Sequence, residues 1–191
     1  MAKENKTKYA ILGVLNLKPS SGYDIKKFCD QSIAHFWNEN YGHIYPVLKT
    51  LEADGWVTKT IESNEGKPDR HVYCITDKGR DALIQWLMQP AEIPQMRYEF
   101  LLKMFFSKDI PIEIVIKRLR ESEAFCRKLK ELYLSVEESL KQQESECPAK
   151  LGLPFWRSTL RYGMIYMEGN IRWCEEMIEY FQSLDKKEGM Y

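Results

Sequence analysis

Apolar residues recur at helical spacing through most of this sequence, in short segments at first and in long ones after residue 96. Between the two parts, Pro90 and Pro94 cannot continue a helix that precedes them, so we expect the chain to divide near residues 89–95. In the first part the spacing predicts three helices, over residues 4–17, 22–33 and 40–54. Gly55 follows the third helix as a natural left-handed stop.

The apolar spacing changes to alternation after the third helix, which is typical of strands. Two alternating segments, residues 56–61 and 70–75, flank a turn-rich tip and predict a β-hairpin. A fourth helix then begins at a cap, Thr76 or Asp77, and continues to Met88. Three helices, a hairpin and a helix in this order are typical of a winged helix-turn-helix domain, in which a weak two-stranded sheet is stabilised by packing on the helices.

The second part of the chain predicts longer helices. Residues 98–106 are expected to form a short buried helix, and Pro111 suits the first turn of the helix that follows. That helix carries a heptad seam, formed by Ile112, Leu119, Cys126, Tyr133 and Leu140, with Val115, Leu129 and Val136 three residues further on. Because a helix of about 45–50 Å exceeds what one small domain covers, we expect the seam to meet a partner chain. Pairing with the last helix of the same chain is the alternative.

The last helix is expected over residues 155–184. Its broad apolar face is predicted to consist of Phe155, Thr159, Tyr162, Tyr166, Trp173, Met177 and Tyr180. These patterns predict a mostly α (α+β) fold, with a winged helix-turn-helix domain over residues 1–89. A long-helix domain suited to dimerisation is expected over residues 96–191.

The charge balance is neutral, with 28 Lys and Arg against 28 Asp and Glu, and residues 1–88 carry 12 against 11. Binding to a nucleic acid would therefore depend on how the cations lie on one face, not on their sum. No apolar run is long enough for a transmembrane helix. The N-terminal apolar stretch is interrupted by Gly13 and Asn16 and makes a poor signal peptide, so we expect a cytoplasmic protein with no membrane partner.

The sequence lacks the signals of catalysis or of a bound metal. The five scattered cysteines form no C-x-x-C pair and predict reduced, mostly buried thiols, not a disulfide framework or a zinc site. The three histidines, His35, His43 and His71, have no metal-ligand spacing. Because no nucleophile motif and no phosphate-binding glycine loop is present either, we expect no enzyme, no cofactor and no metal.

A family signature lies in the third predicted helix, which reads GHIYPVLKTLE over residues 42–52 and is followed by Gly-Trp-Val. Upstream, residues 21–25 read SGYDI, and downstream, residues 70–79 read RHVYCITDKG. In this order and spacing the segments resemble the PadR family of transcriptional regulators, over about 80 residues. The helical C-terminal half is similar to the longer members, of the virulence-activator type. The resemblance implies a winged helix-turn-helix that binds double-stranded DNA.

The candidate DNA contacts come from the geometry of this motif, in which the second helix of the pair enters the major groove. In the third predicted helix, Ile44, Leu48 and Leu51 are expected to point inward. Polar tips on the other side, residues at the start of the second helix and cations of the wing are expected to face DNA. These candidates are Ser21, Tyr23, Tyr41, His43, Tyr45, Lys49, Lys67 and Arg70.

Each of these candidates also has a structural alternative. Tyr45 could belong to the core, His43 could be a capping or surface histidine, and Lys49 could be a solvated charge. Tyr73 and Trp56 are assigned to the core. Aromatic residues are frequent enough for an effector pocket, and the resemblance implies a response to aromatic or amphiphilic small molecules. The candidates are Trp86, Tyr98, Tyr162, Tyr166 and Trp173, unless these rings only fill the core and a dimer interface.

We therefore expect a transcriptional regulator, more commonly a repressor in this family, that binds a pseudo-palindromic operator as a homodimer. Two alternatives remain open from the sequence. One is a winged helix that has lost DNA binding and docks protein partners, which the near-neutral N-terminal part favours. The other is a sensor of small molecules that does not bind DNA.

Overall fold

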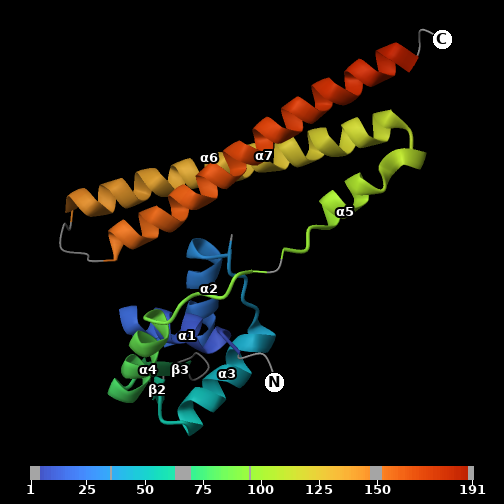
Figure 1. The fold of residues 1–191 in the computed structure, drawn as a ribbon. Helices are drawn as coiled ribbons and strands as arrows, with labels where there is room; N and C mark the ends of the chain where they lie inside the picture. The colour runs from blue at the N-terminus through green and yellow to red at the C-terminus, as the bar shows by residue number, and fades with distance from the viewer. Residues whose placement is uncertain (1–4, 35, 63–69, 95, 147–151, 189–191) are drawn as a thin grey trace. The chain divides into compact units, whose positions relative to one another are not determined.

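The computed structural model describes residues 5–34, 36–62, 70–94, 96–146 and 152–188, without the side chains of residues 143–146 and 185–188. The chain forms two compact units, Met1–Pro94 and Gln95–Tyr191 (Figure 1). The first unit contains α1 (Thr7–Leu17), β1 (Ser20–Ser21), α2 (Gly22–Ser32), α3 (Tyr41–Ala53), β2 (Val57–Glu62), β3 (Arg70–Ile75) and α4 (Asp77–Leu87). The second unit contains α5 (Glu99–Phe105), η1 (Ser107–Asp109), α6 (Ile112–Glu146) and α7 (Leu153–Glu188). The mostly helical fold class with an N-terminal winged helix is confirmed.

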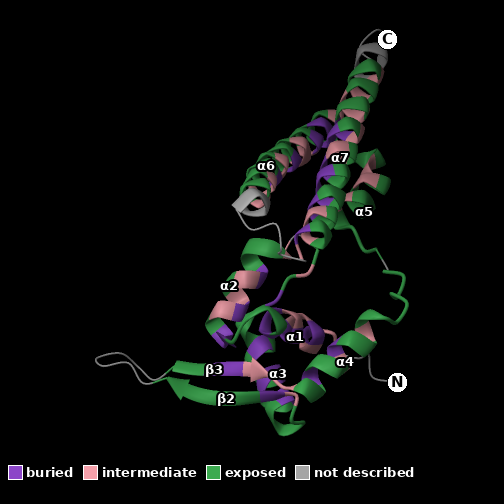
Figure 2. Cartoon of the chain, turned by 90° about the vertical axis from the view of Figure 1, so that its left-hand side faces the viewer, coloured by how far each residue is buried: buried purple, intermediate pink, exposed green. Residues whose placement is uncertain are grey.

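The core of the first unit forms where the apolar faces of its helices and of its sheet pack against one another. Its least exposed large side chains are Ile11, Leu12, Ile25, Ile44, Leu48 and Leu51. The predicted inward direction of the apolar residues of α3 is thus confirmed. Tyr73 is buried in the same cluster and Trp56 packs against it, as predicted for both. Figure 2 shows these buried positions on the sides of the elements that face one another.

The sheet of the first unit has three strands in the order β1-β3-β2, not the two predicted from the sequence. No strand was predicted between the first two helices. Instead, Ser20 pairs with Tyr73 and Ser21 pairs with Val72, so that the start of α2 is tied to the wing. A strand of two residues has no alternation to detect, since its existence depends on a partner more than fifty residues away.

The start of α2 is held by a reciprocal capping box, in which the Asp24 N–H donates to the Ser21 hydroxyl at 3.2 Å. The Ser21 N–H in turn donates to Oδ2 of Asp24 at 2.9 Å. Arg70, the first residue of β3, forms an ion pair with the same carboxylate. Burial alone would raise the pKa of Asp24, but the hydrogen bonds from Ser21 and the charge of Arg70 hold that pKa below its ordinary value. One carboxylate therefore connects α2 with the wing.

The start of α4 packs closely against the beginning of the hairpin. Of the two predicted caps, Thr76 is the one observed, because its hydroxyl accepts the Gly79 N–H at 3.1 Å. A Cβ at Gly79 would lie 2.1 Å from the carbonyl oxygen of Trp56. Only glycine fits this approach, which brings the α4 helix against the core.

In the second unit, α6 and α7 form an antiparallel hairpin (Figure 1). Ion pairs connect Arg127 with Glu175, at 2.5 Å, and Lys130 with Glu168, at 3.2 Å. The heptad seam of α6 faces α7. Along it, Cys126 and Tyr133 are buried among side chains of α7, namely Leu160, Met164, Met167 and Ile171.

The prediction that a partner chain covers this seam was therefore wrong, and the alternative of an intramolecular helix pair is observed. The two helices have 35 and 36 residues, so α7 can cover α6 over its whole length within one chain. Length alone did not require a second chain.

The predicted apolar face of α7 also needs correction. The buried residues include Leu153, Leu160, Met164, Met167, Ile171 and Cys174, whereas Phe155, Tyr162 and Tyr180 are exposed. The helix carries two apolar stripes, one buried and one exposed. The prediction selected the large rings of the exposed stripe instead of the smaller residues of the buried one. Trp173 and Met177 do pack partly, against the cluster around Leu119.

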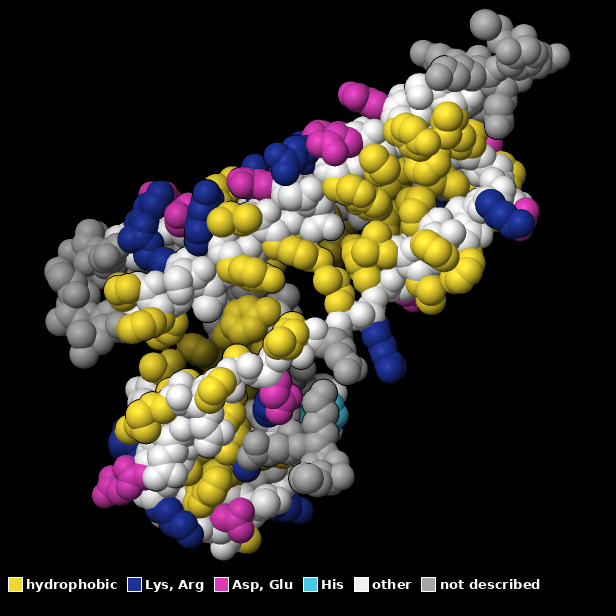
Figure 3. Space-filling model, viewed as in Figure 1, with side chains coloured by type: hydrophobic (Ala, Val, Ile, Leu, Met, Phe, Trp, Pro, Cys, Tyr) yellow, Lys and Arg dark blue, Asp and Glu magenta, His cyan; other side chains and the backbone are white. Residues whose placement is uncertain are grey.

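The predicted burial of the short helix at residues 98–106 was likewise wrong, since no residue of α5 is buried. Phe100 and Met104 pack on the hairpin, but Phe105 and Phe106 are 82% and 68% exposed. This helix of two turns has apolar residues on all sides, but only one side can pack against the hairpin. Figure 3 shows the resulting hydrophobic side chains gathered over α5 and the hairpin beside it.

The Asp24 bridge makes a stability prediction. Replacing Asp24 by Asn removes the charge that Ser21 and Arg70 stabilise, and is expected to lower the free energy of unfolding at neutral pH by about 1 kcal/mol. Because the pKa of Asp24 is lowered by folding, this stabilisation exists above the unfolded-state value near 3.9. It is lost as the pH falls through the folded-state pKa. Urea unfolding of the wild type and the variant between neutral pH and about pH 3 measures it.

Asp30→Asn is the matched control, because Asp30 forms an exposed ion pair with Lys26 within one helix. Such a pair contributes at most about 0.5 kcal/mol. A difference between wild type and Asp24→Asn that stays constant at all these pH values would contradict the bridge.

Candidate nucleic-acid interface

The outer edge of α3 presents polar side chains one turn apart. Tyr41, Tyr45 and Lys49 are all exposed, and the two tyrosine rings are about half accessible. Asn40 caps the helix, because its side-chain oxygen accepts the N–H of His43 at 3.0 Å. Burial of the opposite face in the core fixes this edge toward solvent.

The tyrosine rings of this edge are held in place by α2. Tyr41 and Tyr45 stack with centroids 6.3 Å apart, and the Lys26 ammonium lies 5.8 Å from the Tyr41 ring. A Cβ at Gly22 would lie 2.7 Å from the ring of Tyr45. The missing side chain at the first residue of α2 thus leaves the space in which the Tyr45 ring packs.

The predicted phosphate contacts at the start of α2 differ in exposure. Tyr23 is exposed, whereas Ser21 is buried and its hydroxyl and N–H are both used in the capping box. The phosphate contact of Ser21 stays a prediction. In the structure, Ser21 also caps the start of α2. Tyr23 is the accessible polar group at this helix start.

The cations near this surface are partly engaged by acids. Arg70 is paired with Asp24 and Lys26 with Asp30, while Lys67 lies outside the described residues. Lys49 is exposed and forms no ion pair within the described part of the chain. It is therefore the predicted contact whose charge is most available to a phosphate.

His43 is exposed beside this edge, and its imidazole faces a residue that the sequence reasoning did not select. Glu39, which precedes the cap of α3, is buried, and its carboxylate lies 3.8 Å from Nδ1 of His43. Gly22 and Asp24 were missed as well. The S-x-x-D spacing of residues 21 and 24 is a capping-box signal that could have identified Asp24. The other two depend on contacts between elements.

The predicted effector residues separate into two groups. Trp86 stacks on Tyr9 at 4.4 Å and packs against the core of the first unit. In the second unit, Phe100 lies between two of the others, 6.0 Å from Tyr98 and 5.9 Å from Trp173. The remaining pair, Tyr162 and Tyr166, stacks at 6.4 Å.

Tyr98 connects these two ring pairs of the second unit. Burial raises the pKa of Tyr98, with further contributions from the nearby Tyr166 and Cys126, while a hydrogen bond with Ser122 opposes them. Tyr98, Tyr166 and Trp173 therefore belong to one aromatic region, in which Ser122 provides a polar partner.

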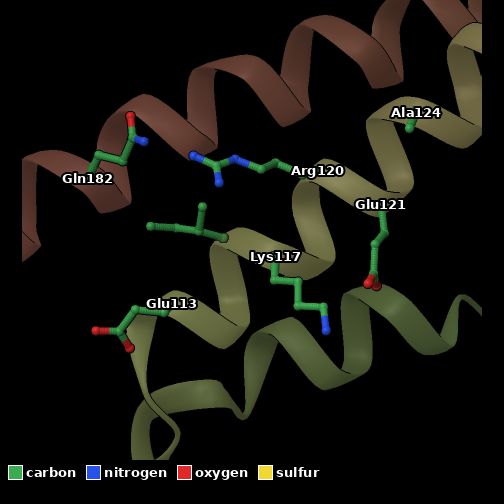
Figure 4. A pocket seen from close by; sticks show the side chains of 7 residues that line it. Glu113, Lys117, Arg120, Glu121, Ala124 and Gln182 are labelled. Atoms are coloured by element: carbon green, nitrogen blue, oxygen red, sulfur yellow. The ribbon is translucent and has the colours of Figure 1, made fainter.

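A separate hollow of about 460 Å³ lies on the hairpin (Figure 4). Its lining consists of Glu113, Ile116, Lys117, Arg120, Glu121, Ala124 and Gln182. Charges of both signs alternate around an apolar floor, and none of the predicted effector residues takes part. The hollow does not coincide with the aromatic region.

Three further features of the described residues concern membrane-spanning helices, metal ligands and cysteines. None of their helices combines the length and the apolar character needed to cross a membrane. Among the same residues, no three His, Cys, Asp or Glu side chains are grouped as metal ligands would be. Of the five cysteines, Cys29, Cys126 and Cys174 are buried free thiols, as predicted, and Cys74 is partly buried.

Comparison with known proteins places these features in a family. Residues 11–85 match the transcriptional regulator PadR-like family, and residues 96–182 match the virulence activator alpha C-terminal family. The negative transcriptional regulator PadR of Bacillus subtilis is 37% identical over 100 residues, 52% of this chain and 55% of that protein. A probable transcriptional regulator of Mycobacterium tuberculosis is 39% identical over 82 residues, 43% of each chain. The matched stretches thus span about half the length of these curated relatives.

Solved structures resemble the chain over nearly its whole length. The Vibrio cholerae virulence activator AphA has a TM-score of 0.71 at 28% identity, over 93% of this chain and 98% of that one. Bacillus subtilis PadR in complex with operator DNA has a TM-score of 0.83 at 24% identity, over 94% and 99%, and shows the same fold. With the two family models covering both units in order, this chain belongs to the PadR-like family of transcriptional regulators.

Proposed function

We propose that this protein is a transcriptional repressor that binds duplex DNA with the exposed edge of α3. The observation that carries the proposal is the row of Tyr41, Tyr45 and Lys49, solvent-exposed on a helix whose other face is buried. A helix placed in this way in a helix-turn-helix can enter the major groove. Bacillus subtilis PadR, which has the same fold, is known in complex with operator DNA. A regulator of this kind works in the cytoplasm.

Local placement of cations supports the proposal despite the neutral total. Several acids near the interface are already engaged, as Asp24 is with Arg70 and Asp30 with Lys26. Lys49 remains for a phosphate, and the N-terminal end of α2 adds backbone N–H groups beside Tyr23. With few contacts for each subunit, the dependence of affinity on salt is expected to be moderate and to double when two subunits bind.

The Lys49 contact can be tested with duplex DNA from the region upstream of the protein's own gene. Lys49→Ala is expected to weaken binding uniformly across related sequences and to reduce the slope of log affinity against log salt by about one per subunit. Fluorescence polarisation at several salt concentrations measures both quantities.

Lys108→Ala is the control, because Lys108 is an equally solvated cation in the second unit, beside Asp109. It should leave affinity and slope unchanged. If the wild type does not bind the duplex, or if both variants lose the same affinity, α3 is not the DNA-reading element. A winged helix that docks proteins would then be the better account.

We further propose that the regulator is a homodimer whose C-terminal helices set the distance between two α3 helices. The second apolar stripe of α7 supports this, because Phe155 and Tyr162 are 72% and 66% exposed there. Exposed rings at helical spacing are typical of association surfaces. Two copies would place their recognition helices on half-sites about one DNA turn, or a multiple of it, apart.

The double variant Phe155→Glu, Tyr162→Glu is expected to shift the protein from dimer to monomer, because two charges would be desolvated in each half of the interface. Light scattering after size exclusion, over a range of concentrations, measures the mass. Ser135→Glu introduces a charge on the exposed side of α6 and should leave the mass unchanged. A wild type that is monomeric, or a double variant that stays dimeric, would rule out this interface.

A small aromatic carboxylic acid is the effector class that we propose for the aromatic region of the second unit. Tyr98, Tyr166 and Trp173 provide rings there, and Ser122 shows that a hydroxyl can be satisfied beside them. Bacillus subtilis PadR is known in complex with p-coumaric acid. A ligand bound in the second unit would change the spacing of the two α3 helices and thereby release DNA.

Quenching of tryptophan emission by p-coumaric acid tests this effector class. Tyr98→Phe keeps the ring but removes the hydroxyl, and is expected to weaken binding about tenfold, which corresponds to one hydrogen bond with a charged group. Tyr180→Phe, at an exposed ring of the same helical hairpin, should have no effect. Absence of saturable quenching, or equal affinity of both variants, would exclude this ligand at this position.

A further inference from the structure

We propose that Glu39 is a positioning residue, which holds the imidazole of His43 in the orientation and tautomer needed to read DNA. The inference rests on the DNA-binding function proposed above and assigns a task to a buried charge beneath the interface. Glu39 is 3% exposed and directly precedes Asn40, the cap of α3. It is thus located where the connector from α2 becomes the recognition helix.

Three segments of the first unit converge on the Glu39 carboxylate. The indole N–H of Trp37, in the connector, donates to Oε1 at 2.5 Å. The hydroxyl of Thr7, in the first turn of α1, donates to Oε2 at 3.2 Å. Cys29 of α2 is also near, because burial, followed by the charges of Glu39 and Asp30, raises the pKa of its thiol to about 11. The carboxylate therefore connects α1 with the connector and the start of α3, and its charge acts on the thiol of Cys29 in α2.

Two neutral donors do not compensate a buried carboxylate in full, because the ion has lost its hydration and retains its charge. Among the described residues, no Lys or Arg forms an ion pair with Glu39. Within the described part of the chain, the basic side chain that the structure places beside it is the imidazole of His43, whose Nδ1 lies 3.8 Å from Oε2. A distance of this size is an electrostatic contact, not a hydrogen bond. Attraction between the two groups therefore orients the ring.

The orientation determines which ring nitrogen remains for DNA. A carboxylate beside Nδ1 favours a proton on Nδ1, so Nε2 is the nitrogen left for a contact. In the neutral ring Nε2 accepts a hydrogen bond, as from the amino group of adenine or cytosine. In the protonated ring it donates, as to a phosphate or to guanine. Because the His43 side chain is 61% exposed and its backbone is fixed by the Asn40 cap, the remaining freedom is the rotation of the ring.

The burial of Glu39 also keeps its negative charge away from a DNA phosphate at the interface. The carboxylate is shielded from solvent by its burial, and the imidazole of His43 is the exposed member of the pair. A phosphate that approaches this end of α3 would therefore meet His43 instead of Glu39. Removal of the charge at position 39 would loosen the ring without removing any group that touches DNA.

A double-mutant cycle on DNA affinity tests the inference with the full-length protein and the duplex from its own upstream region. Glu39→Gln is expected to weaken binding about threefold, the effect of losing one modest, partly exposed electrostatic contact. The same change in a His43→Ala background is expected to have no further effect, because Glu39 acts through His43. Glu39→Asp, which keeps the charge but withdraws it from the ring, provides a second variant if Glu39→Gln does not fold.

Thr7→Val is the matched structural control. It removes a hydrogen bond to the same carboxylate from the side of α1. It is expected to lower the melting temperature but to weaken DNA binding much less than Glu39→Gln, because the charge of Glu39 remains. If Thr7→Val weakens DNA binding as much as Glu39→Gln does, or if Glu39→Gln and His43→Ala are additive, the role of Glu39 is only structural.

A readout without DNA separates this inference from the function on which it rests. In ¹⁵N spectra of histidine-labelled protein, the His43 ring is expected to hold its proton on Nδ1 in the wild type and to lose this preference in Glu39→Gln. An unchanged tautomer in the variant overturns the inference, whether or not DNA binds. Failure of the wild type to bind DNA, with the tautomer change intact, overturns the proposed function and leaves only the orientation of the ring.

Discussion

Burial of one face of α3 determines which of its side chains face solvent, and thereby the proposed DNA-binding edge. Ile44 and Leu48 are fully enclosed by the core of the first unit, with Leu51 beside them. A helix has one rotation about its axis, so burying this face leaves Tyr41, Tyr45 and Lys49 no other direction than solvent. Gly22 then provides the space for the Tyr45 ring, and Asn40 defines where the helix begins. The proposed reading edge is a consequence of the core.

Acids placed under and beside that edge are used as connections within the fold, so that Lys49 keeps an exposed charge in a nearly neutral domain. Asp24 is used to cap α2 and to hold Arg70, and Glu39 is buried between α1 and α3. Both acids lower the net charge, yet they act as connections between elements. Net charge is therefore a poor guide to nucleic-acid binding in a domain whose acids are engaged in its own structure.

Local patterns predicted most of the first unit correctly, because they are expressed within a few residues. Two local signals located α3 and its buried face: the helical spacing of Ile44, Val47, Leu48 and Leu51, and the glycine at position 55. Gly55 has a positive φ in the structure, as expected of a helix stop. The same spacing identified Tyr41, Tyr45 and Lys49 as exposed. Features that depend on distant partners were not predictable: the strand at Ser20, the space at Gly22 and the carboxylate of Glu39 have no local signal.

The second unit shows the limit of periodicity more clearly. A heptad seam predicts that an apolar stripe will be covered, but it does not say by which helix. In this chain α7 is as long as α6 and covers the seam, while the outer stripe with Phe155 and Tyr162 is exposed. That stripe is the surface that we propose for a second copy. Both apolar stripes are present in the sequence, and only the packing of the helices shows which one is buried within the chain.

In the proposed mode of binding, a dimer carries two copies of α3 that read the duplex. Hydroxyl-radical footprinting of the protein on the region upstream of its own gene tests this most directly. Two protected half-sites related by approximate symmetry, with centres about one helical turn or a simple multiple apart, are the predicted result. No protection at concentrations where the protein is folded, or protection of a single asymmetric segment, would contradict the account.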